Sequence, residues 1–158
     1  LRGAGVDLIE RGGDDHLSLA PAVRTDLAEF ERQSRRSVAA AEQAVRRVRG
    51  PVLDGDELLL DLPEIEGIRE RVRVRRLALL ERLVEAAVAT GDREQAIEWA
   101  SAAHVAEPTG EGTALRLVGL LADDGRPADA RAVAAATIHA LAQLEREPSA
   151  RLRAAAHT

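Results

Sequence analysis

A glycine and an alanine recur together at an interval of 34 residues. Gly91 is followed by Ala96, and Gly125 is followed by Ala130. Two antiparallel helices approach closely only where the residues at their contact are small, and a tight turn between them favours glycine, which adopts positive φ at the least cost. A period of about 34 residues is typical of helix-turn-helix repeats. The sequence therefore predicts a mainly α chain built from antiparallel helical pairs.

Further positions fall into the same register. The residues that stand where a tetratricopeptide repeat has small or apolar side chains are Leu83, Gly91, Ala96, Ala103, Pro108, Leu117, Gly125 and Ala130. This region resembles a tetratricopeptide pair, with departures from the pattern at Ala87, Ala100 and Thr137. Because stacked helical pairs usually need about three units for a continuous core, a helix that begins near Asp26 is expected to complete the stack.

Capping and turn residues mark the ends of the predicted helices. Asp92 suits an N-cap, and Pro127 suits the first turn of a helix. The predicted helices cover residues 25 or 26 to 49, 63 to 90, 92 to 108, 109 to 124 and 127 to about 145, with a short tail after Pro148. Residues 49–63 read as a connector that is apolar enough to pack on the body.

Only the first segment has strand character. Val6, Leu8, Leu17 and Leu19 alternate on either side of a Gly-Gly-Asp-Asp sequence at residues 12–15. Glycine and aspartate supply the positive φ that tight hairpin turns need. We therefore predict a short N-terminal β-hairpin within residues 1–24, followed by a helical domain over residues 25–158.

Composition argues against several classes of function. The chain has no cysteine, and the spacing of its four histidines (His16, His104, His139 and His157) matches no metal-binding motif. With one Phe and one Trp as its aromatics, it lacks the stacking platforms of single-stranded nucleic-acid binders. Neither a nucleophile arrangement nor a phosphate-binding loop appears. We expect no metal, no cofactor and no enzyme activity.

The apolar pattern predicts the cellular location of the protein, and the charge pattern shows that the net negative charge is concentrated in its second part. No apolar run is long enough for a membrane span and no secretion signal opens the sequence, so we expect a cytoplasmic protein without a membrane partner. The absence of an initiator Met suggests a fragment of a longer protein. The net charge is −5, with nine Arg against eight acids in residues 1–50 and thirteen against nineteen in residues 51–158. Only the first third could lie near phosphates without repulsion.

The order of segments along the chain carries a family resemblance. After the hairpin come "VRTDLAEFE", "RGPVLDG", a long arginine-bearing helix, "GRPADARA" and "LEREPSARL". This order resembles the Streptomyces antibiotic regulatory protein family, in which an OmpR-type winged helix-turn-helix precedes a bacterial transcriptional activator domain. The resemblance implies that "LRGAG" ends a recognition helix, that the hairpin is the wing, and that an upstream recognition helix reads duplex DNA. Where the family usually has a glycine before the closing segment, this chain has Arg146.

Two groups of arginines are candidate contact residues. Arg2 and Arg11 flank the hairpin and are candidates for DNA phosphate contacts, as in family wings; the alternative is that they are simply solvated. Four arginines on the first helices of the two pairs are expected to meet a protein partner, either a second copy or an RNA polymerase subunit: Arg69, Arg73, Arg76 and Arg116. Acidic segments would suit the row on the long helix. The alternative is pairing with neighbouring glutamates at helical spacing.

Three functions remain open at this point. The favoured one is a DNA-binding transcriptional regulator whose helical domain mediates dimerisation or RNA polymerase recruitment. The second is a tetratricopeptide-like interaction scaffold of a larger signalling protein without direct DNA binding. An enzyme is a distant third.

Overall fold

The computed structural model describes residues 25–33, 36–48 and 63–157, together with the backbone of four short strands within residues 2–19. The helices of these ranges are α1 (Asp26–Gln33), α2 (Val38–Arg47), α3 (Pro63–Thr90), α4 (Arg93–Ala106), α5 (Glu111–Asp123), α6 (Pro127–Ala142) and α7 (Ala150–Ala155). The prediction of a mainly α chain is confirmed.

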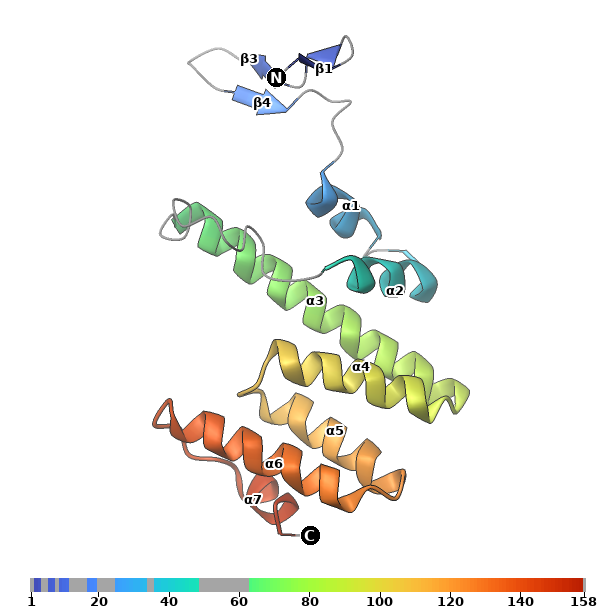
Figure 1. Ribbon diagram of the computed structural model, residues 1–158, viewed down its shortest axis with the longest axis vertical. Coiled ribbons are helices and arrows are strands. Elements are labelled where there is room, and N and C mark those ends of the chain that lie inside the picture. The colour runs from blue at the N-terminus through green and yellow to red at the C-terminus, as the bar shows by residue number, and fades with distance from the viewer. Residues whose placement is uncertain are drawn as a thin grey trace.

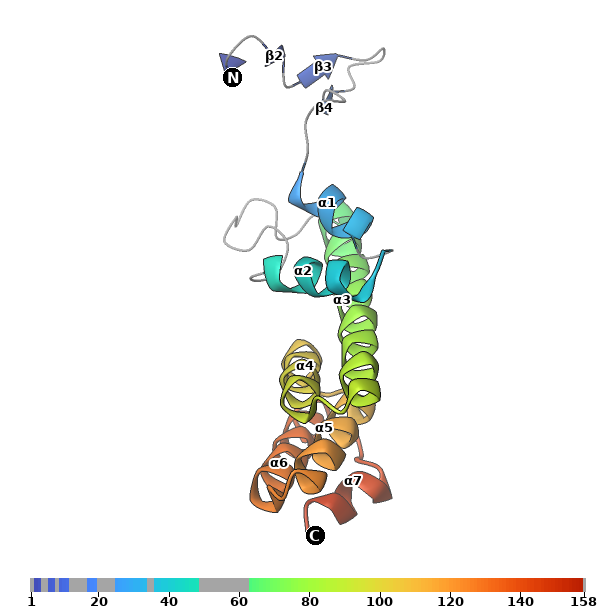
Figure 2. The same cartoon turned by 90° about the vertical axis from the view of Figure 1, so that its right-hand side faces the viewer.

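The helices follow one another along the long axis of the molecule in chain order (Figures 1 and 2). Each of α3, α4, α5 and α6 packs against the next, α2 packs against α3, and α7 packs against both α5 and α6. The result is a stack of antiparallel helical pairs, α3 with α4 and α5 with α6. The α1–α2 pair lies at one end of this stack and α7 at the other.

Helix α3 has 28 residues and is twice as long as α4, which has 14. It therefore extends beyond α4 and packs against the α1–α2 pair as well. Val72 and Leu79 line a cavity together with Phe30 of α1, whereas Val84 lines another together with Ala100 of α4. Two apolar faces on one helix explain why its apolar stripe is wide in the sequence, because each face is buried by a different neighbour.

The two turns inside the helical pairs have the same geometry. Gly91 has φ +76° and Gly125 has φ +75°, both in the left-handed region. In each turn the residue after the glycine donates its N–H to a carbonyl of the preceding helix: Asp92 to Ala87 at 2.9 Å and Arg126 to Leu121 at 2.8 Å. These bonds satisfy carbonyls that a helix end otherwise leaves without partners. The interval of 34 residues is therefore a repeat of turn geometry as well as of sequence.

A third turn of this type closes α6 without a glycine. Glu145 has φ +53°, and Arg146 donates its N–H to the Leu141 carbonyl at 3.0 Å. The left-handed residue is thus Glu145, one position before the site at which the family resemblance places a glycine. A residue with a Cβ pays a steric cost in this conformation.

Replacing Glu145 by Gly is expected to raise the free energy of unfolding by up to about 1 kcal/mol, because glycine removes the steric cost of the left-handed conformation. Urea denaturation followed by circular dichroism measures the change. Gln143→Gly is the matched control, since Gln143 has an ordinary helical φ of −63° and should lose stability on the same change. A less stable Glu145→Gly variant would contradict the turn assignment.

The prediction of one continuous helix from residue 25 or 26 to 49 is wrong. The chain forms two helices there, α1 and α2, and Ser37 caps the second by accepting a hydrogen bond from the Ala40 N–H at 3.3 Å. Val45 of α2 and Phe30 of α1 are both buried. The missing partner of the stack is therefore itself a helical pair.

The segment after Pro148 is a helix and not merely a tail. Ser149 caps α7 by accepting a hydrogen bond from the Leu152 N–H at 3.2 Å, and its own N–H donates to the Glu111 carboxylate at 3.1 Å. Leu152 is fully buried in a cluster with Ala134 and Leu141. This short helix closes the apolar end of the α5–α6 pair.

The predicted hairpin lies only partly within the described residues. Strand β3 (Ile9–Arg11) pairs antiparallel with β4 (Leu17–Leu19), and β1 (Arg2–Gly3) pairs with β2 (Val6–Asp7). The predicted turn at residues 12–15 and the connector at residues 49–62 lie outside the described ranges. The hairpin as a whole, and the division of the chain after residue 24, stay predictions.

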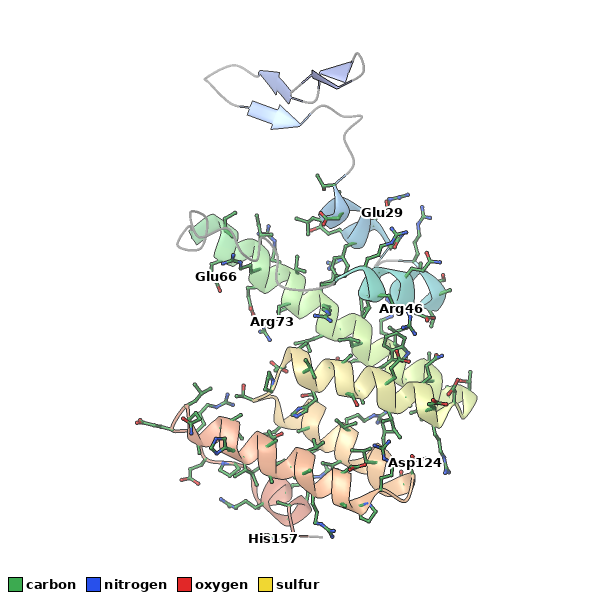
Figure 3. The ribbon with its side chains drawn as sticks, viewed as in Figure 1. Glu29, Arg46, Glu66, Arg73, Asp124 and His157 are labelled. Carbon is green, nitrogen blue, oxygen red and sulfur yellow. The ribbon has the colours of Figure 1, made fainter. Side chains whose placement is uncertain are left out.

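The junction between α2 and α4 is polar. Arg46 bonds to Glu42 on its own helix at 3.0 Å and reaches Glu98 of α4 at 3.2 Å. The guanidinium carbon of Arg46, which is labelled in Figure 3, lies 4.6 Å from the centre of the Trp99 ring. A cation placed over an indole is attracted by the ring's quadrupole, so one side chain ties the α1–α2 pair to the repeats.

The part of the chain that the structure describes contains no helix with both the length and the apolar character needed to cross a bilayer.

Candidate functional site

Two hollows lie between α3 and α5, with α4 as their floor. One hollow of about 280 Å³ is lined by Glu81, Val84 and Glu85 of α3, Ala100 and Ala103 of α4, and Gly112, Thr113 and Arg116 of α5. A second hollow of about 410 Å³ lies further along the same helices and is lined by Val88 of α3, Gly91 of the turn, Arg93 and Ala96 of α4, and Leu120 and Asp123 of α5. We call the two hollows together the α3–α5 groove.

The groove follows from the alanines of α4. Ala96, Ala100 and Ala103 are spaced so that they share one face of this helix, and all three are buried. Their methyl groups fill little space between the walls that α3 and α5 form. The small residues of α4 therefore let the neighbouring helices approach closely, and they also leave a hollow between α3 and α5.

The charges at one end of the groove are available to a partner. Glu81, Glu85 and Arg116 are exposed and make no hydrogen bond or ion pair with any residue in the described ranges. Two carboxylates stand on the α3 wall and one guanidinium stands on the α5 wall. When a partner binds, the main free-energy cost at these side chains is the loss of their hydration, because they have no internal ion pair that must break first.

Arg73, by contrast, is held by two glutamates. The guanidinium of Arg73, which is labelled in Figure 3, donates to both carboxylate oxygens of Glu70, at 2.7 Å each, and to Glu107 after α4 at 3.2 Å. The bond to Glu70 first, and that to Glu107 second, raise the pKa of Arg73, and Arg73 in turn lowers the pKa of Glu70. Arg73 therefore joins α3 to the end of α4.

The four arginines predicted to form a partner face do not come together in one cavity. Arg116 lines the α3–α5 groove, whereas Arg69, Arg73 and Arg76 are not among its lining residues. The Nε atom of Arg76 is buried and has no hydrogen-bond partner among the described residues. Arg69 already interacts with another residue of the chain. Their contact with a protein partner stays a prediction.

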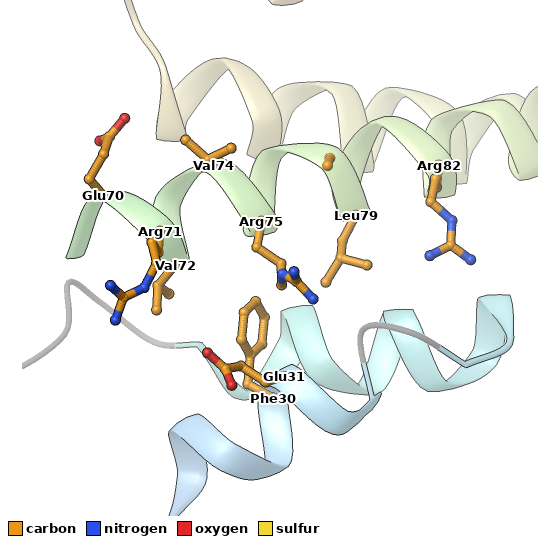
Figure 4. Close-up of a pocket in the computed structure, with 10 residues that line it drawn as sticks. Phe30, Glu31, Glu70, Arg71, Val72, Val74, Arg75, Leu79 and Arg82 are labelled. Atoms are coloured by element: carbon orange, nitrogen blue, oxygen red, sulfur yellow. The ribbon is translucent and has the colours of Figure 1, made fainter. Parts of the chain in front are cut away.

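Another cavity lies between α1 and α3. It has a volume of about 500 Å³, with Phe30 against Val72 and Leu79. Figure 4 shows the Phe30 ring directed towards α3, and the side chains of Arg71, Arg75 and Arg82 directed towards α1 and α2. Arg82 donates to the Arg36 carbonyl at 3.4 Å, and Arg75 also has an interaction partner. This cavity belongs to the packing of the α1–α2 pair on α3.

His104 of α4 is half-buried, and its Nδ1 atom has no hydrogen-bond partner among the described residues. Burial lowers its pKa, because a desolvated imidazole resists protonation. The unfolded chain therefore binds more protons near the ordinary pKa of 6.5. His104 contributes stability fully above that pH and loses it as the pH falls towards the lowered folded value.

We expect the free energy of unfolding to decrease as the pH is lowered from about 7.5 to about 5.5, and His104→Gln to reduce this dependence. Urea midpoints of both proteins across this range measure it. Parallel pH profiles for the two proteins would show that the burial of His104 has no part in the effect.

The remaining predicted site residues lie in the strands and at the repeat positions. Arg2 lies in β1 and Arg11 in β3, and contact with DNA is a prediction for both. In the described ranges no three His, Asp or Glu side chains gather in a way that could hold a metal ion. The buried repeat positions are Leu83, Ala96, Ala103, Leu117 and Ala130, while Pro108 is exposed after α4.

Sequence reasoning missed Glu81, Glu85 and Gly112 as groove residues. Glu81 and Glu85 are four residues apart and so share a helix face, which was a visible signal. This spacing was not used, because glutamates near the arginine-rich run were interpreted as ion-pair partners of those arginines.

Comparison with known proteins gives one match. The family described as bacterial transcriptional activator domain matches residues 19–158. No curated protein matches the chain. No solved structure matches it either.

Proposed function

The chain belongs to the bacterial transcriptional activator domain family, and we propose that it is the helical effector part of a DNA-binding transcriptional regulator of the Streptomyces antibiotic regulatory protein type. The family match covers the whole helical stack. The order of segments along the sequence supports the narrower assignment, including a wing before α1 and a recognition helix upstream. The proposal assigns no catalytic step to the chain.

The α3–α5 groove is the observation that carries the proposal. A hollow with an apolar floor and unpaired charges on its rim can take a segment of another protein, since stacked helical pairs expose such surfaces. We propose that this groove positions a partner, either a second copy of the regulator or a subunit of RNA polymerase, next to the promoter. DNA would be read by the upstream recognition helix.

A tethering experiment tests the effector role. The chain is fused to an unrelated DNA-binding domain that places it upstream of a weak bacterial promoter, and transcription of a reporter gene is measured. We expect the fusion to raise reporter transcription above the level of the DNA-binding domain alone. If a folded, bound fusion leaves transcription unchanged, the effector role is wrong and the scaffold function becomes the better alternative.

Gly112→Leu tests the groove within the same assay. A Cβ at Gly112 would meet no atom within 4 Å, so a side chain can begin there without a clash, and leucine would add bulk at a residue that lines the hollow. Gly67→Leu is the matched control, because Gly67 is an equally open glycine on α3 that does not line the groove. We expect Gly112→Leu to abolish activation and Gly67→Leu to retain it. Equal activation by both would exclude the groove.

The location of DNA reading gives a separate prediction. We expect the 158-residue chain to bind duplex DNA weakly, without sequence preference, and to release it as salt is raised. The chain carries a net charge of −5, and the contacts proposed for Arg2 and Arg11 are with phosphates, which carry no sequence information. Fluorescence anisotropy with labelled duplexes of different sequence measures this. Tight, salt-resistant and sequence-selective binding by this chain would contradict the proposal that an upstream recognition helix reads the DNA.

A further inference from the structure

The α3–α5 groove combines an apolar floor with an acidic wall. The floor is formed by Ala100 and Ala103, which are only 2% and 3% exposed, so an occupant would contact mainly the two walls beside this floor. Above it stand Glu81 and Glu85, one helical turn apart on α3 and exposed, with no ion pair in the described ranges. Arg116 alone stands opposite them. Two carboxylates against one guanidinium leave this end of the groove negative.

This combination matches the chemistry of an Arg or Lys side chain. Such a side chain has an apolar stem, which can lie against Gly112 and Thr113 on the α5 wall, and a cationic head, which can reach the carboxylates on the α3 wall. One turn further along the groove, Val88 and Leu120 offer an aliphatic contact. An occupant would therefore place a basic residue and an aliphatic residue about one helical turn apart, or about two residues apart in an extended chain.

We infer that the α3–α5 groove binds a basic segment of its protein partner, through an Arg or Lys that lies between Glu81 and Glu85 and an aliphatic residue that contacts Val88 and Leu120. The inference rests on the proposed function of the groove and adds the chemistry of its occupant. It reverses the expectation of an acidic partner that the arginines of α3 suggest. Arg73, which would face such a partner, is already bonded to Glu70 and Glu107.

The charges also predict which variants change binding, and in which direction. Glu81→Gln with Glu85→Gln removes both carboxylates while keeping the size of the side chains. Glu66→Gln with Glu94→Gln is the matched control: both residues are exposed, neither lines the groove, and the net charge changes by the same amount. Arg116→Gln should act in the opposite direction, because it removes the cation that lines the same hollow as Glu81 and Glu85, whereas Arg93 lines the other hollow.

The test uses a displayed library of random peptides of about 12 residues, selected on the 158-residue chain. We expect Arg and Lys to be enriched about twofold or more over the unselected library, with an aliphatic residue at the predicted spacing. Selection on the Glu81→Gln, Glu85→Gln variant should lose this enrichment, and selection on the control variant should retain it. Enrichment of Asp or Glu, no enrichment, or the same enrichment on the groove variant would each overturn the inference.

One selected peptide, made synthetically with a fluorescent label, gives the size of the effect. We expect its Kd to rise about threefold to tenfold for Glu81→Gln, Glu85→Gln, to stay within about twofold for the control, and to fall for Arg116→Gln. Equal weakening by groove and control variants would indicate general attraction to an acidic protein and would overturn the inference. The proposed function is judged separately, because loss of reporter activation in Gly112→Leu does not depend on the charge of the occupant.

Discussion

Gly125→Val is expected to lower the free energy of unfolding by about 1–3 kcal/mol. A Cβ at this position would meet no atom within 4 Å, so crowding does not contribute. The cost arises because a β-branched residue is strained at φ +75°. Gly91→Val should behave in the same way, since its φ is +76° and its surroundings are equally open. Urea denaturation of the purified variants measures both.

Gly119→Val is the control for these variants. Gly119 lies inside α5, has no positive φ, and its Cβ would also meet open space. Valine has a higher helix propensity than glycine, so this change should be neutral or slightly stabilising. If Gly119→Val and Gly125→Val lose equal stability, backbone strain at the turn is not the cause.

Leu152→Ala is expected to lower the free energy of unfolding by about 2–5 kcal/mol, the range for removing a buried leucine from a core. Leu152 is 0% exposed and is the one buried residue of α7. Its side chain shares a cluster with Ala114, Ala134 and Leu141, so its loss opens the end of the α5–α6 pair. Thermal or urea denaturation reports the change.

Leu144→Ala provides the comparison for Leu152→Ala. Leu144 is 57% exposed just before the third left-handed turn, so truncating it removes little buried surface. We expect a change within about 0.5 kcal/mol. Similar losses for both leucines would mean that α7 does not seal the core.

The sequence was most informative where structure depends on local chemistry. A tight turn that needs positive φ selects glycine, so Gly91 and Gly125 could be placed before the structure was known. Asp92 could likewise be assigned as an N-cap, because its carboxylate has to reach the N–H of Gln95, and the two atoms lie 3.1 Å apart. Both features depend on residues within one turn of each other.

Two errors arose where local signals were ambiguous. Phe30 and Val38 are eight residues apart, a spacing that one continuous helix also satisfies, and this concealed the break that Ser37 caps. Helix α7 has only six residues and a single buried leucine, which is too short for a periodic pattern. Its stability comes from tertiary contacts with α5 and α6, and these are not visible in a short stretch of sequence.

The candidate site could be predicted only in part. Arg116 was identified from its place on the first helix of the second pair. Glu81 and Glu85 face it only because α4 holds α3 and α5 on either side, an arrangement of residues more than 30 positions apart in the chain. Arg73 illustrates the same point, since its bond to Glu107 joins residues 34 positions apart. Ion pairs between helices could therefore not be predicted from the sequence, because they depend on how the fold brings distant residues together.

The contact between Arg46 and Trp99 has a spectroscopic consequence. Trp99 is 3% exposed and is the only tryptophan in a chain without tyrosine, so the tryptophan emission of the protein comes entirely from the boundary between α2 and α4. If α2 detached before the repeats melted, water would reach the indole and its emission would shift to the red while the helical circular dichroism persisted. Coincident transitions would show that the α1–α2 pair and the repeats unfold as one cooperative unit. An unlabelled sample therefore reports whether the segment that follows the strands moves independently of the stack.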